Sequence, residues 1–266
     1  MAPALETFAL TRRFGNLTAV DSLSLSIQSG ETFGLLGPNG AGKTTTIKML
    51  TTLLPPTSGS ASVAGFDLRR QPGDVRRVIG YVPQLLSADG TLTGRENLEI
   101  LGKLYDIPRR DLRRRVDEAL EFMGLQDSGN RMVRDYSGGM IRRLEVAQSM
   151  LHRPPILFLD EPTTGLDPVA RRTVWELVRR LRENYGTTIL LTTHLMEEAD
   201  RLCRRVAVMN HGIVAAIGSP AGLKKGLHKP GATLDDVFIH FTGHQLDSGG
   251  TYRDTSRTRR VARRLG

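Results

Sequence analysis

Short apolar runs alternate with longer amphipathic segments along most of the chain. Apolar and polar residues alternate over 23–27, and a compact apolar run at 32–36 is followed by a glycine-rich turn and a helical segment at 43–54. Further strand-like apolar runs lie at 78–82, 156–160, 187–192 and 205–209. Helical segments such as 169–185 separate the later runs. This order of strand and helix predicts an α/β fold with a mainly parallel sheet.

The pattern changes between the runs at 78–82 and 156–160, where charged helical sequence takes over. Helices are predicted at 94–105 and 111–123, with a third beginning near Gly138. We interpret about residues 85–150 as a helical subdomain inserted into the α/β core. The arginine-rich run at 109–115 is interpreted as a solvated helix face, because no aromatic residues that could stack on bases are interleaved with it. Nucleic acid is therefore not an expected partner.

Composition and charge narrow the classes of protein to which the chain can belong. Of its 266 residues, 39% are apolar and 24% are charged, which suits a globular protein of this size. The formal net charge of +9 favours anionic partners such as nucleotides, lipid headgroups or nucleic acid, without choosing among them. No run approaches the roughly 18 apolar residues that cross a bilayer. The chain is not expected to form a membrane pathway by itself.

Both the start of the sequence and its single cysteine favour the cytoplasm. Residues 1–14 lack the basic start, apolar centre and small-residue cleavage site of a secretory signal. Cys203 has no second cysteine with which to form an internal disulfide, which fits a reducing compartment. We expect Cys203 to be a buried small residue rather than a reactive thiol.

A phosphate-loop pattern occupies the turn between the apolar run at 32–36 and the helix that follows. Its residues, which with the next threonine are the predicted nucleotide contacts, are Gly37, Pro38, Asn39, Gly40, Ala41, Gly42, Lys43, Thr44 and Thr45. The glycines allow successive amides to point at phosphate oxygens, and the helix N-terminus adds a favourable dipole. Lys43 is expected to reach the β- and γ-phosphates, and the Thr44 hydroxyl to ligate Mg²⁺. An ordinary glycine-rich turn would need neither residue.

Two acidic residues end the apolar run at 156–160. Ligands bind at the carboxyl ends of strands in open α/β folds, and this strand delivers Asp160 and Glu161 to that edge. Asp160 is predicted to take part in the Mg²⁺ shell, and Glu161 to orient the attacking water or accept its proton. The alternative is that the two acids are solvated residues at the start of a loop.

A second cluster of small residues, Ser137, Gly138 and Gly139, precedes a long helix and offers further free amides for a phosphate. Its place between the phosphate loop and the acidic pair resembles the signature sequence of ATP-binding cassette (ABC) ATPases. The resemblance extends through about residue 220. It implies a phosphate-loop NTPase core with a mainly parallel sheet, an antiparallel β subdomain and an inserted helical subdomain, and it implies ATP and Mg²⁺ as cofactors.

Four further positions match elements of the ABC family in order. Gln84 resembles the Q-loop residue, Asp167 belongs to a D-loop-like Gly-Leu-Asp, His194 resembles the switch histidine, and Phe14 matches the aromatic that stacks on adenine. The resemblance implies that Gln84 joins Mg²⁺ or water to the helical subdomain and that His194 contacts the γ-phosphate. Together with Lys43, Gln84, Glu161 and His194 are the predicted catalytic residues, and Thr44, Gln84 and Asp160 the predicted Mg²⁺ ligands.

The chain departs from common family members at a few of these positions. Tyr136 and Met140 flank the signature cluster where many relatives have Leu and Gln, and Phe14 replaces the commoner tyrosine but keeps a ring face for stacking. The phosphate-contacting members of the motif set are intact. The resemblance also implies that the signature cluster of one copy closes over the ATP held by the phosphate loop of a second copy.

Within the family, the signature region and the segment at 233–243 resemble exporter subunits of the daunorubicin drug-resistance type. That resemblance implies a peripheral subunit at the cytoplasmic face of the cell membrane, bound to a separate integral permease and driving export of a drug-like or amphipathic molecule. Exporters of lipid or polysaccharide are an alternative. So is an ABC ATPase that serves DNA repair, translation or cofactor assembly without a permease.

Three regions are expected along the chain. Residues 1–220 would form the ABC ATPase domain, and residues 221–251 a small C-terminal extension. Residues 252–266 carry many arginines and few apolar side chains, so we predict a basic, disordered tail. This tail could contact anionic lipid or remain solvated without a partner.

Overall fold

The central sheet brings the predicted strands together in a non-sequential order. The computed structural model describes residues 3–243 of the 266-residue chain. In that range six strands form one sheet in the order β10-β9-β3-β8-β7-β6. They are β3 (Thr32–Leu36), β6 (Ile79–Val82), β7 (Ile156–Asp160), β8 (Thr188–Thr193), β9 (Arg205–Asn210) and β10 (Ile213–Gly218). Only the β9–β10 pair is antiparallel, which confirms the mainly parallel sheet.

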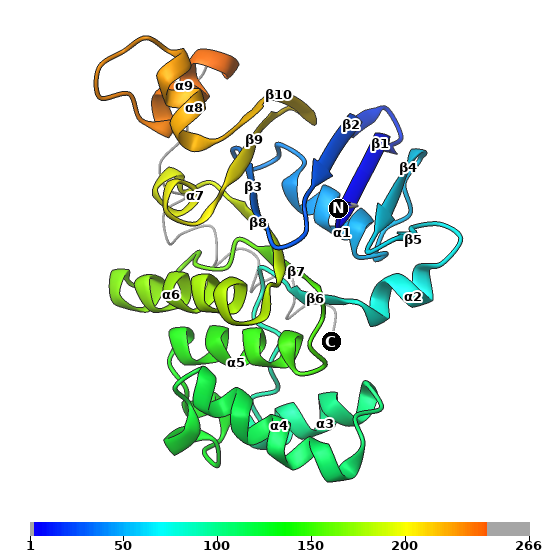
Figure 1. The fold of residues 1–266 in the computed structure, drawn as a ribbon, viewed down its shortest axis with the longest axis vertical. Helices are drawn as coiled ribbons and strands as arrows, with labels where there is room; N and C mark the ends of the chain where they lie inside the picture. The colour runs from blue at the N-terminus through cyan, green and yellow to red at the C-terminus, as the bar shows by residue number, and fades with distance from the viewer. Residues whose placement is uncertain (1–2, 244–266) are drawn as a thin grey trace, which may run out of the picture.

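A second sheet of four antiparallel strands lies beside the central sheet (Figure 1). Its order is β2-β1-β4-β5, with β1 (Leu5–Phe14), β2 (Leu17–Ile27), β4 (Ser58–Val63) and β5 (Phe66–Asp67). Buried side chains of both sheets pack with α1 (Lys43–Leu50) into one apolar core that includes Leu10, Phe33, Ile47 and Phe158. The antiparallel β subdomain implied by the family resemblance is present.

The inserted helical subdomain occupies the lower part of Figure 1. It contains α3 (Gly94–Leu104), α4 (Arg109–Phe122) and α5 (Gly138–Met150), with single turns at η1 (Gln126–Ser128) and η2 (Val133–Asp135). In α4, Leu112, Val116 and Leu120 are buried at four-residue spacing, whereas Arg113 and Arg114 are exposed and Arg115 is partly buried. The predicted insertion is confirmed, and the arginines of the run at 109–115 are solvated except for Arg115.

Among the described residues, four further helices pack on the same face of the central sheet as the helical subdomain, and a fifth lies elsewhere. They are α6 (Pro168–Tyr185), α7 (Met196–Leu202), α8 (Pro220–Gly226) and α9 (Leu234–Thr242), and α2 (Pro72–Arg77) lies near β5 and β6. Leu157 and Leu159 of β7 face a second apolar core, opposite Phe158, as the two-residue period of a strand requires. Val237 and Phe238 of α9 belong to this second core. The described part of the predicted C-terminal extension therefore packs on the ATPase core.

One difference from the sequence-based expectations concerns the end of a helix. The helix predicted at 43–54 ends at Leu50, because Thr52 has a φ of 64° and two prolines follow soon after. The predicted basic tail at 252–266 lies outside the described residues. Within residues 3–243, no helix combines the length and apolarity needed to cross a membrane.

Candidate functional site

The loop between β3 and α1 depends on glycines that approach neighbouring backbone closely. A Cβ on Gly37 would lie 2.4 Å from the carbonyl oxygen of Met209, and one on Gly42 would lie 2.4 Å from that of Ala19. Gly42 also has a φ of 100°, which glycine adopts far more readily than other residues. The sequence therefore folds into a turn too tight for side chains at these two positions.

Helix α1 begins directly after this turn. The amide of Thr46 donates to the carbonyl oxygen of Gly42 at 2.9 Å, and this is the bond that opens the helix. The amides of Lys43, Thr44 and Thr45 precede it and have no carbonyl partner within the helix. Free amides at a helix N-terminus favour an anion such as a phosphate group.

Lys43 is buried beneath the loop, with its side chain only 4% exposed. Its Nζ donates to the carbonyl oxygens of Gly37 at 2.8 Å and Pro38 at 3.0 Å. The same ammonium lies 3.1 Å from Oε1 of Glu161. The structure thus joins the phosphate loop to the predicted catalytic acid through this lysine.

Glu161 receives contacts from three of the predicted catalytic side chains. Besides Lys43, the amide nitrogen of Gln84 donates to its Oε2 at 3.2 Å, and Nδ1 of His194 lies 3.2 Å from the same oxygen without ideal hydrogen-bond alignment. The hydroxyl of Thr164 also donates to Oε2, at 3.1 Å. Side chains from four separate segments of the sequence converge on this carboxylate.

The electrostatic surroundings of Glu161 keep its side chain ionised. Burial acts to raise the pKa of this carboxyl, but His194 and the ammonium of Lys43 outweigh burial and lower the pKa to about 2. Glu161 is therefore a carboxylate at neutral pH, able to accept hydrogen bonds and protons but not to donate one.

Asp160 and Thr44 form a second cluster next to Glu161. The hydroxyls of Thr192 and Thr44 donate to Oδ1 of Asp160 at 2.6 Å and 3.1 Å. Its other oxygen, Oδ2, is buried and has no hydrogen-bond partner among residues 3–243. Burial raises the pKa of Asp160 despite these two hydrogen bonds. An acceptor in this situation is suited to a cation.

The signature-like cluster lies apart from the phosphate loop. Ser137 is exposed and caps α5, accepting a hydrogen bond from the amide of Met140 at 3.3 Å. A Cβ on Gly139 would lie 2.8 Å from Cβ of Ala170 in α6, so this end of α5 packs closely on α6. Within the part of the chain that the structure describes, no hydrogen bond or ion pair joins residues 137–139 to residues 37–45.

The last two predicted nucleotide contacts are also on the surface. Asp167 caps α6, where its Oδ1 accepts from the amides of Val169 and Ala170 at 2.9 Å each. Phe14, at the end of β1, is 45% exposed, and the guanidinium of Arg12 lies 4.5 Å from the centre of its ring. One folded chain thus gathers the phosphate-loop, Gln84, Asp160, Glu161 and His194 positions, and leaves Phe14, the signature cluster and Asp167 exposed.

Residues 20–164, more than half of the chain, match the model of the ABC transporter family. The chain belongs to this family. The daunorubicin resistance ATP-binding protein DrrA2 of Streptomyces coeruleorubidus is 49% identical over 83% of this chain and 68% of its own length. The Nod factor export ATP-binding protein I of Ralstonia nicotianae is 44% identical over 89% of this chain and 73% of its own length.

A solved structure supports the same assignment. An ATP-binding cassette in a dimeric post-hydrolysis state with bound ADP and phosphate superposes on this ABC subunit with a TM-score of 0.72, at 26% identity, over 81% of this chain and 98% of the other. The chain is thus an ABC ATP-binding subunit, homologous to the ATPases of drug-resistance exporters, and it binds and hydrolyses ATP. Subunits of this family work with membrane permeases and dimerise.

Two residues of this ABC subunit that the sequence analysis did not single out hold the Gln84 loop. Arg142 of α5 donates to the carbonyl oxygens of Pro83 at 2.7 Å and Gln84 at 2.8 Å, and forms a buried ion pair of 3.0 Å with Glu145. Glu145 in turn accepts from the backbone amide of Ser87. The spacing of three residues between Arg142 and Glu145 on a predicted helix is the sequence signal that could have identified this ion pair.

Thr192 was also missed, although it places Asp160 directly. Besides its bond to Asp160, its hydroxyl oxygen accepts from the amide of Glu161 at 3.0 Å. Because β8 lies beside β7 in the sheet, the end of one strand orients both acids at the end of the other. The pair of threonines before His194 is the sequence signal that could have identified it.

Proposed function

We propose that this chain powers export of a drug-like or otherwise amphipathic molecule through a separate integral membrane permease. The observation that carries the proposal is the 49% identity, over 83% of the chain, to a daunorubicin resistance ATP-binding protein. The predicted site residues support it, because the carboxylate, the lysine and the histidine that ATP hydrolysis needs are present and lie together. The subunit would sit peripherally at the cytoplasmic face of the cell membrane, held there by the permease.

Hydrolysis would depend on a change of partner for Lys43. When its ammonium turns from Glu161 toward phosphate oxygens, Glu161 loses one of the charges that lower its pKa. A carboxylate with a higher pKa is a better proton acceptor. Glu161 would then orient a water and accept its proton, while Gln84 and His194, which both approach Oε2 of Glu161, hold the carboxylate in place.

The residues around Asp160 fit a bound Mg²⁺. The buried, unpartnered Oδ2 of Asp160 and the hydroxyl of Thr44 are hard oxygen ligands of the kind Mg²⁺ prefers, and the side chain of Gln84 reaches the neighbouring Glu161. When bound, the ion would neutralise charge on the phosphate oxygens. The arrangement leaves further ligand positions for phosphate and water, which matches how Mg²⁺ is usually held with nucleotides.

Two copies of the chain would be required for complete sites. Ser137 and Gly138 are exposed, and residues 137–139 form no hydrogen bond or ion pair with the phosphate loop of their own chain, so this cluster is free to reach that of a second copy. Phe14 would stack on the adenine, and Asp167 would lie near the contact between the two chains. Closure of the dimer would draw the helical subdomains together, and the Gln84 loop would transmit that movement to the permease.

The decisive experiment measures transport. Vesicles that contain this chain and its candidate permease should move a fluorescent amphipathic substrate only with ATP, and matched vesicles with Glu161→Gln should bind ATP without transport. Glu161→Gln keeps the size of the side chain but replaces one accepting oxygen with a donating amide, so it removes the proton acceptor. The proposal fails if no membrane protein co-purifies and the chain instead associates with DNA or ribosomes.

Export of a different class of molecule is the second candidate. It is favoured by the 44% identity to a Nod factor export ATP-binding protein, which covers slightly more of this chain than the daunorubicin relative does. A panel that includes lipids and oligosaccharides in the same vesicles separates the two. Stimulation of ATP hydrolysis by an oligosaccharide alone would favour this second function.

A further inference from the structure

A cavity of about 340 Å³ lies away from Glu161, where the helical subdomain meets the core. Its walls come from α4 and α5 on one side, and from residues 153–155 and the end of α6 on the other. None of the predicted nucleotide-site residues lines it. This volume falls within the range of small-molecule sites, about 300–1,000 Å³. We call it the α4–α6 cavity.

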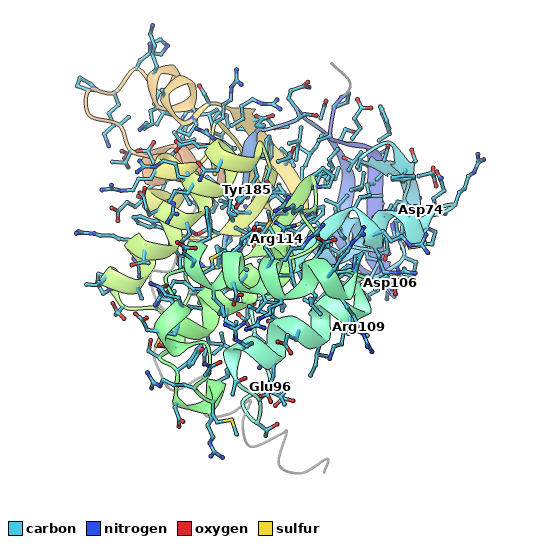
Figure 2. The ribbon with its side chains drawn as sticks, turned by 60° about the horizontal axis from the view of Figure 1, so that its bottom comes forward. Asp74, Glu96, Asp106, Arg109, Arg114 and Tyr185 are labelled. Carbon is cyan, nitrogen blue, oxygen red and sulfur yellow. The ribbon has the colours of Figure 1, made fainter. Side chains whose placement is uncertain are left out.

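The lining of the α4–α6 cavity suits a flat apolar body. Phe122 and Tyr185 form a tilted aromatic pair with ring centres 5.5 Å apart, and Tyr185, labelled in Figure 2, is 53% exposed. Met123 and Met150 also line the cavity. Aromatic faces and flexible thioethers make favourable contacts with ring systems. The half-exposed Tyr185 places this surface within reach of solvent.

A guanidinium at the same cavity has unsatisfied bonding capacity. Arg115 donates from Nη1 to the carbonyl oxygen of Leu151 at 3.3 Å, whereas its Nη2 makes no hydrogen bond within residues 3–243 and is accessible to solvent. A charged donor that is open to a cavity forms strong, charge-assisted hydrogen bonds with an anionic ligand. Arg115 lines the α4–α6 cavity, so a ligand there could supply the acceptor.

The acidic side chain that lines this cavity, Glu118, already forms ion pairs with arginines other than Arg115. Glu118 pairs with Arg153 at 3.1 Å and with Arg114 at 2.7 Å. Arg114 also lies 3.5 Å from Asp111, which leaves Arg115 without an ion-pair partner within residues 3–243. Arg180 lies 4.3 Å from the ring centre of Phe122 and adds a further cation nearby. The local balance is therefore positive, which complements an anion.

We propose that the α4–α6 cavity binds a small aromatic anion, with its rings against Phe122 and the methionines and its anionic group at Arg115. Such a ligand would touch α4, α5 and the end of α6 at the same time. It would therefore link the helical subdomain to the core at a position separate from the nucleotide. The site is independent of the transported molecule, whose identity does not enter the argument.

Two matched fluorescent probes test the class of ligand. The probe 8-anilinonaphthalene-1-sulfonate carries an anionic group, and N-phenyl-1-naphthylamine has the same rings without it. Arg115→Met keeps an apolar stem but removes the guanidinium, so it should weaken binding of the sulfonate by about tenfold or more and leave the uncharged probe nearly unaffected. Arg113→Met, an exposed change on the same helix, is the control and should affect neither.

The location is tested by blocking the cavity and by observing its methionines. Ala119→Trp should fill the space and remove binding of both probes. In wild-type protein with ¹³C-labelled methionine methyl groups, addition of the sulfonate should shift Met123 and Met150, while Met49 and Met209 in the other core stay unchanged. The methyl experiment needs no folded cavity variant.

Three results would overturn the proposal. Equal weakening of both probes by Arg115→Met would remove the case for an anion. Shifts centred on Met49 or Met209 would place the probe elsewhere. Displacement of the sulfonate by saturating ATP and Mg²⁺ would show that it occupies the nucleotide site instead.

Discussion

Lys43 and Glu161 form an ion pair of 3.1 Å, although each side chain is only 4% exposed. A pair buried this deeply is stabilised only when both charges have additional hydrogen bonds, and here the lysine has two backbone carbonyls and the glutamate has two side-chain donors. The pair therefore links the stability of the site to the two groups that we propose take part in hydrolysis.

Lys43→Ala should reduce ATP turnover by at least about a hundredfold, because it removes the cation predicted to bind the β- and γ-phosphates. The measurement is phosphate release by the purified chain. Lys48→Ala, an exposed change on the same helix, should leave turnover within experimental error. Thermal unfolding of both variants shows whether loss of the ion pair has also unfolded the protein. Turnover near the wild-type rate in folded Lys43→Ala would refute the assignment.

Ser137→Arg should abolish turnover although residue 137 does not touch the phosphate loop of its own chain. The arginine would place bulk where a phosphate of the second copy's nucleotide must dock. Mixing this variant with Lys43→Ala should restore part of the activity, because mixed dimers contain one complete site and one doubly damaged site. Absence of any recovery in mixtures shown to form mixed dimers would argue against shared sites.

Arg142→Met should destabilise the protein by roughly 3–5 kcal/mol, because it leaves Glu145 buried without its partner. The double variant Arg142→Met with Glu145→Met should recover part of this loss, since no unpaired charge remains. Urea unfolding of the three proteins measures the difference. The double variant should still hydrolyse ATP slowly, because the Gln84 loop has lost the arginine that bonds to its carbonyls.

The start of α9 should respond to pH through Asp236. A hydrogen bond from Lys229 is the main cause that lowers the pKa of this carboxyl from 3.8 to about 2, helped by hydrogen bonds from Thr233. A lowered pKa means that the carboxylate stabilises α9 above about pH 4 and that this contribution is lost as the pH falls toward 2.

The amide of Thr233, which donates to Asp236 at 2.8 Å, reports this titration by nuclear magnetic resonance. Lys229→Met should move its midpoint upward, toward the ordinary value for aspartate. Lys225→Met, on α8, is the control and should leave the midpoint in place. An unchanged midpoint in Lys229→Met would mean that the lysine does not lower the pKa of Asp236.

Local sequence patterns located the strands of the site, but they did not identify the residues of neighbouring strands that contact it. The run at 156–160 matches β7 residue for residue. Asp160 at its end and Glu161 directly after it lie at the carboxyl edge of the parallel sheet, where ligands bind in such folds. Thr192 could not be assigned to them from the sequence, because 31 residues separate it from Glu161 and only the pairing of β8 with β7 brings them together. Strand pairing is a non-local property that a sequence window does not contain.

The antiparallel sheet was predicted only from the family resemblance, because its strand pairing is also non-local. β1 pairs with β4 across more than forty residues, and its ladder is interrupted by a register shift between Phe8 and Thr11. Interrupted alternation hides the two-residue period on which strand prediction depends. The family motifs, by contrast, are short and contiguous, so they were visible without any knowledge of the fold.

Glu161 has a φ of 47°, a backbone conformation that glycine would adopt with less strain. A glycine here would relieve about 1–2 kcal/mol of conformational strain but would leave the buried ammonium of Lys43 without its carboxylate partner, which costs more, roughly 3–5 kcal/mol. The ion pair with Lys43 therefore holds the backbone of residue 161 in this strained conformation. A selection for thermal stability alone, with no requirement for ATP hydrolysis, should accept a glycine at this residue only together with a neutral replacement of Lys43.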